Sequence, residues 1–548
     1  MKHKALKVHP RDNVIVALTN LIKGETISFG GTEYLLPENI PAKHKFFMQD
    51  MNAGDEVIMY GVLVGKTQSA ITKGSRMTTD NTKHAAEPYA YRNARFEWQA
   101  PDISKFKGQT FNGYHRKDGR VGTANYWLFI PTVFCENRNL DVIREAMHNE
   151  LGYAVTDKYK QYTKQLVQSY AKGENVSAIS FAPPSPLEKV KERAFPNVDG
   201  IKFLNHQGGC GGIRQDAAIL SKLLAAYADH PNVGGVTVLS LGCQNLQVED
   251  FKNDLKQHNP HFDKPLYIFE QQQSQSEEQL IADAIRQTFE GLIEINKLER
   301  KPAGLDKLCI GVKCGGSDGF SGISANPSVG YCSDLVVALG GQVLLAEFPE
   351  LCGVEQEMID RSVNEPVARK FMQLMKSYDK IVTDAGSSFS MNPSPGNIKD
   401  GLITDAIKSA GAAKKGGTSP VVDVLDYTEP ATKPGLNLVC TPGNDVEATT
   451  GKAASGATLI LFTTGLGTPT GNPICPTIKV STNSNLTKRM NDIIDIDCGP
   501  VIEGEKTIEQ MGEEILAYCI KAASGEVIPK AVQLNQDDFI PWKRGVSL

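Results

Sequence analysis

The hydrophobic pattern at the start of the chain consists of short apolar runs separated by turn-forming residues. The runs cover residues 14–18, 56–60 and 61–65, and the breaks between them contain Gly30-Gly31, Pro37 and Ala53-Gly54-Asp55. Short apolar runs bounded by glycine, proline and aspartate are typical of β-strands and their turns. The pattern predicts a small β-rich domain over residues 1–87, followed by a polar, proline-containing linker over 88–110 that crosses the surface.

From residue 111 onward, β-type apolar runs alternate with segments of helical period. In the segment 214–229 the apolar side chains recur at helical spacing, and the segment 280–295 repeats the pattern. Such spacing predicts amphipathic helices. Strands that alternate with helices favour mainly parallel sheets covered on both faces. Turn residues cluster at 300–304, so we predict two α/β domains, over 111–300 and 301–548.

Composition adds limits to this architecture. The net charge is −5, with 41% hydrophobic and 22% charged residues, so neither nucleic acid nor an anionic membrane is an expected partner. The longest apolar stretch, 126–135, is interrupted by Pro131 and falls well short of the about 20 residues of a membrane span. No apolar segment of a secretory signal follows the basic start. The eleven cysteines indicate reduced thiols, so we expect a cytoplasmic protein.

Four cysteines directly follow predicted strands. Cys135, Cys210, Cys243 and Cys314 come after the runs 127–134, 201–204, 236–241 and 308–312. Ligands of open α/β sheets bind at the carboxyl ends of strands, and thiolate and imidazole groups hold transition metals. A single cysteine there is more often a small buried hydrophobe, so the prediction depends on the set. Without C-x-x-C spacing, the site must be assembled across the fold.

Acidic residues and hydroxyls follow two further predicted strands. The run 342–346 leads to Glu347, Glu350 and Glu355, which can act as ligands or as a general base, or can simply begin a solvated helix. The run 459–462 leads to the hydroxyl-rich loop 463–472, which suits a polyol carboxylate and lacks the Gly-Lys-Ser/Thr of a phosphate-binding loop. Arg116 and Arg120, before the first strand of the central domain, can bind a carboxylate or form a surface turn.

These segments, taken in order, resemble the altronate/galactarate dehydratase family over nearly the whole chain. The N-terminal part is similar to that family's SAF domain in 9–14, 40–45 and 60–61. The more specific matches are 112–114 with 118–123, Gly209-Cys210-Gly211, Leu241-Gly242-Cys243, 313–318 continuing through 320–323 to 325–327, 392–397, 462–465 and Pro541-Trp542. The implied fold is α/β, with a small N-terminal β-rich SAF-like domain followed by two α/β domains with mainly parallel sheets.

The resemblance implies dehydration of a hexonic or hexaric acid to a 2-keto-3-deoxy acid, with dependence on Fe²⁺ or, second, Mn²⁺. In such chemistry a base removes the proton α to the carboxylate, a cation stabilises the resulting dianion, and an acid assists departure of the hydroxyl. We therefore predict three sets of site residues. They are Glu347, Glu350 and His206 for catalysis, Arg120, Asn125, Ser321 and Asn326 for substrate contacts, and Cys210, Cys243, Cys314 and Asp80 for metal binding.

The N-terminal domain departs from the family pattern at one motif. The family commonly carries a Val-His-Thr-His-Asn-like segment, and the matching residues here are Met77-Thr78-Thr79-Asp80-Asn81. Both histidines are replaced, by Thr78 and Asp80, so the metal site, the metal or the substrate differs in this chain. His84 is placed to compensate, although an isolated histidine after a loop is more often solvated.

Several alternatives stay open at this point. Altronate is the first expected substrate and galactarate the second, and a sulfolactate sulfo-lyase-like reaction would eliminate sulfite instead of water. A non-catalytic sugar-acid-binding protein is a reading of another class. An iron–sulfur cluster on Cys135, Cys210, Cys243 or Cys314 is an alternative to a single metal ion. The expected partners are a small-molecule sugar acid and further copies of the chain in a homo-oligomer.

Overall fold

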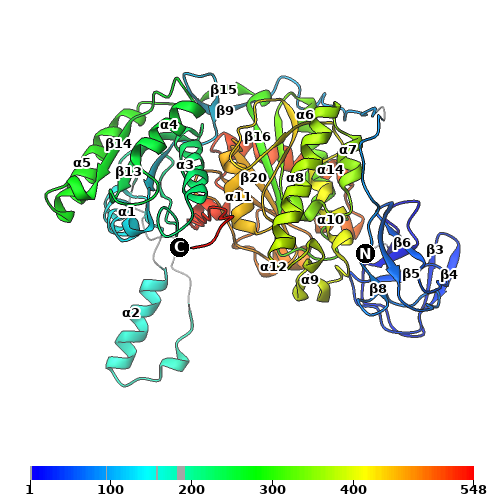
Figure 1. Ribbon diagram of the computed structural model, residues 1–548. Helices are drawn as coiled ribbons and strands as arrows, with labels where there is room; N and C mark the ends of the chain where they lie inside the picture. Colours follow the sequence, from blue (N-terminus) through cyan, green and yellow to red (C-terminus); the bar gives the residue numbers. More distant parts are fainter. Residues whose placement is uncertain (1–2, 94–95, 156–157, 182–191, 548) are drawn as a thin grey trace.

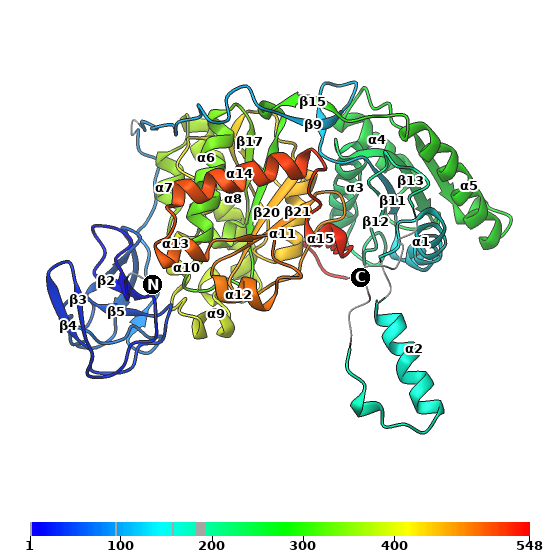
Figure 2. The same cartoon turned by 180° about the vertical axis from the view of Figure 1, so that it is seen from behind.

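The computed structural model describes residues 3–93, 96–155, 158–181 and 192–547, which form three domains. The C-terminal domain lies between the N-terminal and the central domain in both views (Figures 1 and 2). The chain runs from the N-terminal domain over the C-terminal domain to reach β9 (Thr110–His115), the first strand of the central domain (Figure 2). Within this predicted linker, residues 94 and 95 lie outside the described part of the chain.

The N-terminal domain consists of short antiparallel strands in three small sheets, ordered β1-β2-β5, β3-β4 and β6-β7-β8. In strands such as β6, buried and less buried residues alternate, so that one face of the strand packs into a small core. The short apolar runs of the sequence predict such strands. The strands are β1 (Ala5–Leu6), β2 (Val14–Ala17), β3 (Thr26–Phe29), β4 (Thr32–Leu35), β5 (Lys45–Phe47), β6 (Glu56–Met59), β7 (Val62–Thr67) and β8 (Thr82–Lys83).

The central domain is built on a four-stranded parallel sheet in the order β12-β11-β13-β14. A second sheet, in the order β10-β9-β15, is antiparallel. It pairs β9, at the start of the central domain, with β15, which directly follows the predicted boundary at 300. The remaining strands are β10 (Val121–Gly122), β11 (Tyr126–Pro131), β12 (Gly200–Phe203), β13 (Val233–Ser240), β14 (Leu266–Glu270) and β15 (Lys301–Gly304). The helices are α1 (Asn137–Leu151), α2 (Lys158–Ala171), α3 (Arg214–Asp229), α4 (Val248–His258) and α5 (Glu277–Ile295).

The C-terminal domain contains a seven-stranded parallel sheet in the order β18-β19-β17-β16-β20-β21-β22. Its strands are β16 (Cys309–Cys314), β17 (Gln342–Leu345), β18 (Val421–Leu425), β19 (Gly435–Val439), β20 (Leu459–Thr464), β21 (Thr477–Ser481) and β22 (Ile496–Asp497). Its helices are α6 (Ala325–Ala338), α7 (Glu355–Asp360), α8 (Glu365–Asp384), α9 (Pro395–Lys399), α10 (Asp405–Ala413), α11 (Asp445–Ala454), α12 (Ser484–Arg489), α13 (Gly499–Glu503), α14 (Ile508–Ala523) and α15 (Lys530–Gln533). Helices cover both faces of the sheet, which explains why β16 and β20 are buried along their whole length.

The predicted fold class is confirmed, and one predicted helix matches its observed bounds. Helix α3 spans the predicted 214–229, whereas α5 begins three residues earlier than the apolar period, at Glu277. The earlier start has a local cause, because the Ser276 side chain accepts a hydrogen bond from Gln279 N and caps the helix. Among the described residues, no helix combines the length and the apolar character needed to cross a membrane.

The N-terminal domain is fixed to the C-terminal domain by buried polar contacts. Lys45 in β5 is fully buried, and its Nζ donates a hydrogen bond of 2.6 Å to the carbonyl of Gly401. Lys43 Nζ lies 3.1 Å from Asp318 Oδ2 and 2.9 Å from Asp400 Oδ1. Thr404 Oγ1, at the start of α10, donates to Val64 O in β7 at 2.8 Å. The N-terminal domain therefore borders the loops at the carboxyl edge of the large sheet.

Candidate functional site

The strand order of the large sheet reverses beside β16. From β16 the chain passes to β17 on one side, and β20 later joins β16 on the other side. Open parallel sheets bind ligands outside the carboxyl ends of the strands at such a reversal. Lys313 and Cys314 end β16, Glu347 follows β17, and the hydroxyl-rich loop follows β20. The charged side chains at this edge are therefore the candidates for ligand binding.

A buried carboxylate lies at the centre of the edge. Glu347 forms a short ion pair with Lys313, and its Oε2 lies 3.2 Å from Lys415 Nζ and 3.9 Å from Lys452 Nζ. Lys313 also pairs with Asp445 at 3.0 Å. Glu347 and its three lysine partners are almost completely buried. A buried charge is tolerated only when it is paired, which explains why these groups gather.

A thiol and a second carboxylate extend this group towards the outside. Lys415 Nζ donates to Cys314 Sγ at 2.8 Å, and Cys314 Sγ lies 3.5 Å from Glu350 Oε2. Glu350 Oε1 pairs at 2.9 Å with Lys408 Nζ, whose side chain is 11% exposed. We call this set the buried charge group; its members are Lys313, Cys314, Glu347, Glu350, Lys408, Lys415, Asp445 and Lys452.

The members of the buried charge group differ in their protonation states. Burial lowers the pKa of Lys452 to about 7, and its Nζ forms no hydrogen bond with any described residue. Although burial alone would raise the pKa of Glu350, the Lys408 and Lys313 ammonium groups hold it well below its usual range. Burial is likewise outweighed at Lys408, where Glu350 raises the ammonium pKa. The group thus offers ammonium donors, ionised carboxylates and one amine, Lys452, that loses its proton near pH 7.

A divalent cation fits poorly among Cys314, Glu347 and Glu350. Their ligand atoms lie within 4.8 Å of one another, which suits a metal by distance alone. Each of the three is already bound by a lysine ammonium: Cys314 by Lys415, Glu347 by Lys313 and Lys415, and Glu350 by Lys408. Positive charges at that distance oppose a further cation. We therefore derive no catalytic step from a metal at this position, and Cys314 as a metal ligand stays a prediction.

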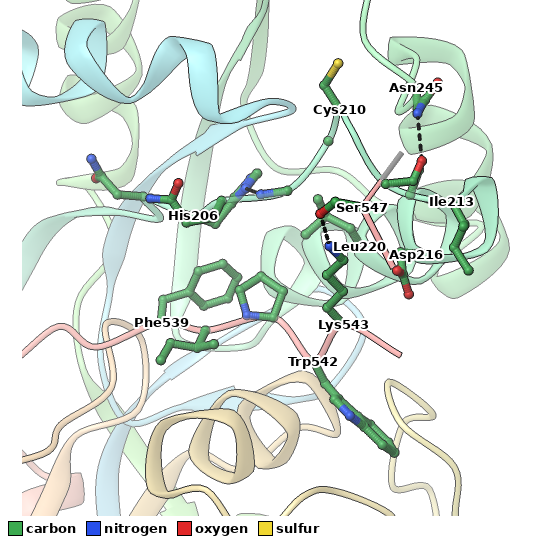
Figure 3. Close-up of a pocket in the computed structure, with 18 residues that line it drawn as sticks. His206, Cys210, Ile213, Asp216, Leu220, Asn245, Phe539, Trp542, Lys543 and Ser547 are labelled. Atoms are coloured by element: carbon green, nitrogen blue, oxygen red, sulfur yellow. Dashed lines mark hydrogen bonds between the residues drawn. The ribbon is translucent and has the colours of Figure 1, made fainter. Parts of the chain in front are cut away.

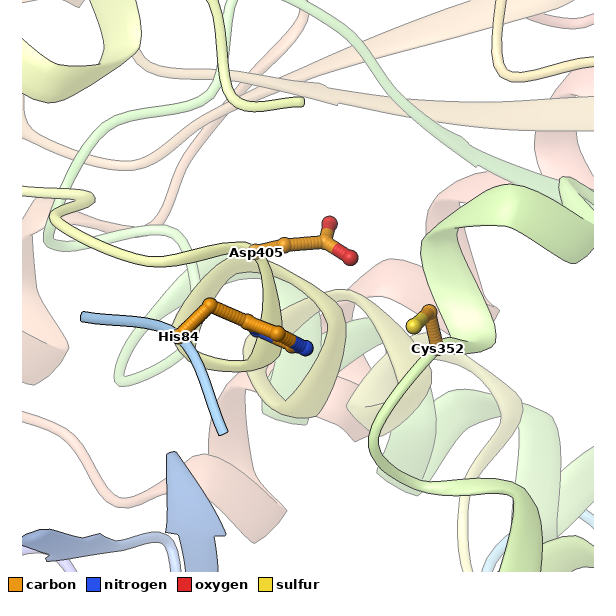
Figure 4. Close-up of side chains that lie close together, drawn as sticks. All are labelled: His84, Cys352 and Asp405. Carbon is orange, nitrogen blue, oxygen red and sulfur yellow. The ribbon is translucent and has the colours of Figure 1, made fainter. Parts of the chain in front are cut away.

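A second group of potential ligands lies at the border between the N-terminal and C-terminal domains. His84, Cys352 and Asp405 offer atoms within 4.8 Å of one another (Figure 4). His84 follows β8, Cys352 follows Glu350 in the loop after β17, and Asp405 begins α10. No lysine ion pair is recorded for any of the three within the described ranges, in contrast to the buried charge group.

A pocket of about 370 Å³ lies in the central domain, where the end of the chain packs against it (Figure 3). His206 and Cys210 from the loop after β12 line it together with Asp216, Trp542 and others. His206 is held in place because Nδ1 accepts from Gly208 N at 3.0 Å and Nε2 contacts Pro131 O at 2.8 Å. Burial lowers its pKa to about 4, so the imidazole is neutral and both nitrogens are engaged.

The predicted metal ligands do not form a single site. Cys314 is buried with Glu347 and Glu350, whereas Cys210 and Cys243 are exposed at the carboxyl edge of the smaller sheet. Among the described residues, neither Cys210 and Cys243 nor the exposed Asp80 belongs to a group of three close ligands. The common site expected for Cys210, Cys243 and Cys314 is therefore wrong, because their strands belong to two different sheets.

The predicted substrate contacts all have partners within the protein. Arg120 pairs with Asp118 and Asp229, and Asn125 Nδ2 donates to two backbone carbonyls. Ser321 bonds to the Asp318 carboxylate, and Asn326 bonds to Gly411 O and Thr463 Oγ1. These bonds explain the positions of the four side chains, and their contact with substrate stays a prediction.

The lysines of the buried charge group are the functional candidates that the sequence interpretation missed. Lys408 and Lys452 come from helices and Lys415 from the turn after α10, so none follows a predicted strand. One signal was available at Lys313, which stands inside a strand flanked by apolar residues and buried on both faces. A lysine in such a strand needs a buried anionic partner.

Gly465 keeps the loop after β20 close to the loop after β16. A Cβ at this position would overlap the carboxylate of Asp318, which is buried and binds Lys43, Ser321 and Thr482. Gly465→Ala is expected to lower the free energy of unfolding by about 1–3 kcal/mol, as overpacking does. Urea denaturation measures the effect. Gly396→Ala is the control, since a Cβ there meets no atom within 4 Å, and an equal loss in both variants would contradict the explanation.

Comparison with protein families gives matches to all three domains. The SAF domain of altronate/galactarate dehydratases matches residues 3–85. The second domain of D-galactarate dehydratase/altronate hydrolase matches 113–296, and the C-terminal domain of D-galactarate/altronate dehydratase matches 305–547.

Named relatives agree with these matches. Altronate dehydratase of Bacillus subtilis (strain 168) is 33% identical, and altronate dehydratase of Escherichia coli (strain K12) is 32% identical, each with 99% of both chains covered. Galactarate dehydratase (L-threo-forming) of Escherichia coli (strain K12) is 32% identical over 95% of this chain and 93% of its own. The chain therefore belongs to the altronate/galactarate dehydratase family of hydro-lyases, with the SAF domain at its N-terminus.

Proposed function

We propose that this chain dehydrates altronate to a 2-keto-3-deoxy sugar acid and depends on a divalent metal, with Fe²⁺ as the first expected ion. The full-length similarity to two altronate dehydratases supports altronate ahead of galactarate. The single structural observation that carries the proposal is the buried charge group at the carboxyl edge of the large sheet. It combines ammonium groups that can bind a carboxylate with an amine that can accept a proton.

Proton removal is assigned to Lys452. A general base must be unprotonated at the working pH, and lysines with a pKa lowered by burial serve this role in other enzymes that form enediolates. Lys452 Nζ has no hydrogen-bond partner in the described part of the chain. It lies beside Glu347, which counters the positive charge that appears when the amine takes the proton. The predicted catalytic role of Glu347 is thereby a positioning and charge-balancing role.

Substrate binding is assigned to the least buried residues of the buried charge group. Lys408 is the most exposed of its lysines, and Asp445, which pairs with Lys313, is 28% exposed. Lys408 donates to Glu350 and to Asn392 Oδ1 at 2.9 Å, which leaves a third N–H for an incoming carboxylate. A divalent cation, when bound, supplies further positive charge for the enediolate that forms after loss of the α-proton.

A substrate screen tests the proposal. The purified chain is expected to form a 2-keto-3-deoxy acid from altronate with added Fe²⁺, more slowly with Mn²⁺, and only weakly from other hexonates and hexarates. A keto-acid colour reaction and mass spectrometry measure the product.

The remaining alternatives give different results in the same screen. Preferred turnover of galactarate would replace altronate as the substrate. Release of sulfite from sulfolactate would replace the hydro-lyase reaction by carbon–sulfur cleavage. Binding of sugar acids without any turnover would contradict an enzymatic function.

A further inference from the structure

We propose that His84, Cys352 and Asp405 bind one divalent transition-metal ion at the border between the N-terminal and C-terminal domains. The three residues come from the segment after β8, the loop after β17 and the first turn of α10. A role of this ion in dehydration rests on the proposed function, whereas binding of the ion does not. The sequence analysis had considered only His84 of these three, as a replacement for the missing histidines, and had placed the metal on cysteines at strand ends and on Asp80.

The distances suit a single ion. One ligand atom from each residue lies within 4.8 Å of the other two. Bonds of about 2.0–2.3 Å from one metal to imidazole, thiolate and carboxylate ligands place those ligands up to about 4.6 Å apart. Figure 4 shows the three side chains directed into the same space from three separate segments. Closing the site therefore needs only small side-chain movements.

Asp405 provides an independent reason to expect a cation. Its side chain is 1% exposed, and among the described residues only the neighbouring Cys352 thiol is placed to donate to its carboxylate. Buried polar atoms are rarely left unpaired, and a buried carboxylate without a partner is costly. The positive end of α10 compensates for part of a charge, typically about half an elementary charge. Burial raises the pKa of Asp405 to about 8, so the carboxyl holds a proton when no ion is bound, and a divalent ion would take the place of that proton.

His84 presents a ring nitrogen to the other two ligands. The backbone N–H of Ala406 donates to Nδ1 at 3.3 Å, so Nδ1 is the unprotonated nitrogen of the neutral ring. A metal ion would bind Nδ1 in place of this long hydrogen bond.

The surroundings of Cys352 are anionic. The carboxyl groups of Asp405, Glu355 and Asp379 are all near enough to act electrostatically on this thiol. Glu355 is itself buried and accepts from Gly353 N at 2.7 Å. The nearest cation of α10, Lys408, is paired with Glu350. A positive ion is therefore favoured here, and it would deprotonate the thiol on binding.

The ligand types select the class of ion. A set of one nitrogen, one sulfur and one oxygen suits Fe²⁺ or Zn²⁺, whereas Mg²⁺ and Ca²⁺ prefer oxygen ligands throughout. Three protein ligands leave at least one position open, as in catalytic metal sites. Cys352 lies two residues after Glu350, and Asp405 lies three residues before Lys408 in α10. The site is thus close along the chain to Glu350 and Lys408 of the buried charge group.

Cobalt binding to the metal-free full-length chain tests the proposal without reference to turnover. We expect one Co²⁺ per chain and a thiolate-to-cobalt charge-transfer band in the near ultraviolet. Cys352→Ser should abolish the band. Loss of a contact that only supports a metal ligand costs about 10–100-fold in affinity. His84→Gln removes a ligand and should therefore weaken cobalt binding by more than this. His261→Gln is the matched control, because His261 is exposed and outside both ligand groups, and its affinity should equal that of the wild type.

A band that persists in Cys352→Ser would overturn the proposal. So would a band that is lost in Cys210→Ser or Cys243→Ser, because it would move the metal to the central domain. A cobalt band without any sugar-acid turnover would leave the site standing and contradict the proposed function. Iron-dependent turnover without a cobalt band, with Fe²⁺ affinity unchanged in Cys352→Ser, would overturn the metal site and leave the proposed function standing.

Asp405→Asn gives a second test, because its effect on thermal stability should differ between the metal-free and the metal-bound protein. Without metal, the variant should melt at the same or a higher temperature than the wild type, because a poorly paired buried carboxyl group is removed. With saturating Co²⁺, the wild type should gain thermal stability and the variant should gain little, since only binding to the folded state stabilises it. A variant that is less stable without metal, yet gains as much as the wild type from cobalt, would overturn the proposal.

Discussion

Lys452→Met is expected to lower kcat for sugar-acid dehydration by about 10²–10⁴-fold, the usual contribution of a general base. Methionine keeps the length and burial of the side chain but cannot accept a proton. The charge-balancing Glu347 remains bound by Lys313 and Lys415, so the fold should tolerate the change. Steady-state kinetics measured as keto-acid formation should show the loss mainly in kcat.

The pH profile provides a more specific signature of Lys452. Its pKa is lowered by burial to about 7, so the amine is protonated and inactive as a base below that pH and neutral above it. The kcat of the wild type should therefore rise through about pH 7. The residual activity of Lys452→Met should lack this step. A step of unchanged position and size in the variant would contradict the assignment.

Lys479 offers a matched control for Lys452. It is also buried, its pKa is lowered by burial to about 7, and its Nζ lies 3.4 Å from the centre of the Phe462 ring without a hydrogen-bond partner among the described residues. Among the described residues Lys479 forms no ion pair with a member of the buried charge group, although Asp445 and Lys313 act on it electrostatically. Lys479→Met should leave kcat within a few-fold of the wild type. An equal loss in both variants would indicate a general effect of buried lysines.

The fold was largely predictable from the sequence because its strands and helices carry strong local patterns. Helix α3 has one apolar stripe along its whole length, and β16 and β20 each begin with a run of mainly apolar residues because helices cover both sheet faces. The pattern of apolar residues along the sequence does not show which distant segments of the chain pack together. The segment 539–547, at the end of the predicted C-terminal domain, lines a pocket of the central domain.

The candidate site was predictable only where it follows strands. Glu347, Glu350 and Cys314 were found because strand ends of a parallel sheet share one edge. The same rule selected Cys210 and Cys243, which lie at the edge of a second sheet, since it does not say which sheet a strand joins. Lys408 and Lys452 were missed because a lysine in a helix usually indicates a solvated surface. Asp405 and Cys352 meet His84 only through the docking of two domains.

Glu347→Gln is expected to lower the free energy of unfolding by about 3–5 kcal/mol, the usual cost of removing one partner from a buried ion pair. Glutamine keeps the shape of the side chain and its backbone bond to Thr441 Oγ1. It removes the charge that compensates Lys313, Lys415 and Lys452, which are buried with it. Urea denaturation of the variant and the wild type at pH 6 measures the difference, because all three lysines are protonated to a large extent there.

Two further variants separate this cost from other effects of the substitution. Glu294→Gln breaks the exposed pair with Lys297 and should cost less than about 1 kcal/mol, as surface ion pairs do. The double variant Glu347→Gln with Lys313→Met should recover part of the stability, since the closest unpaired ammonium is then absent. If Glu347→Gln costs no more than Glu294→Gln, the buried charge group is not held together by Glu347. In that event its lysines would have to be neutral in the folded protein, and the division into ammonium donors and one amine base would no longer hold.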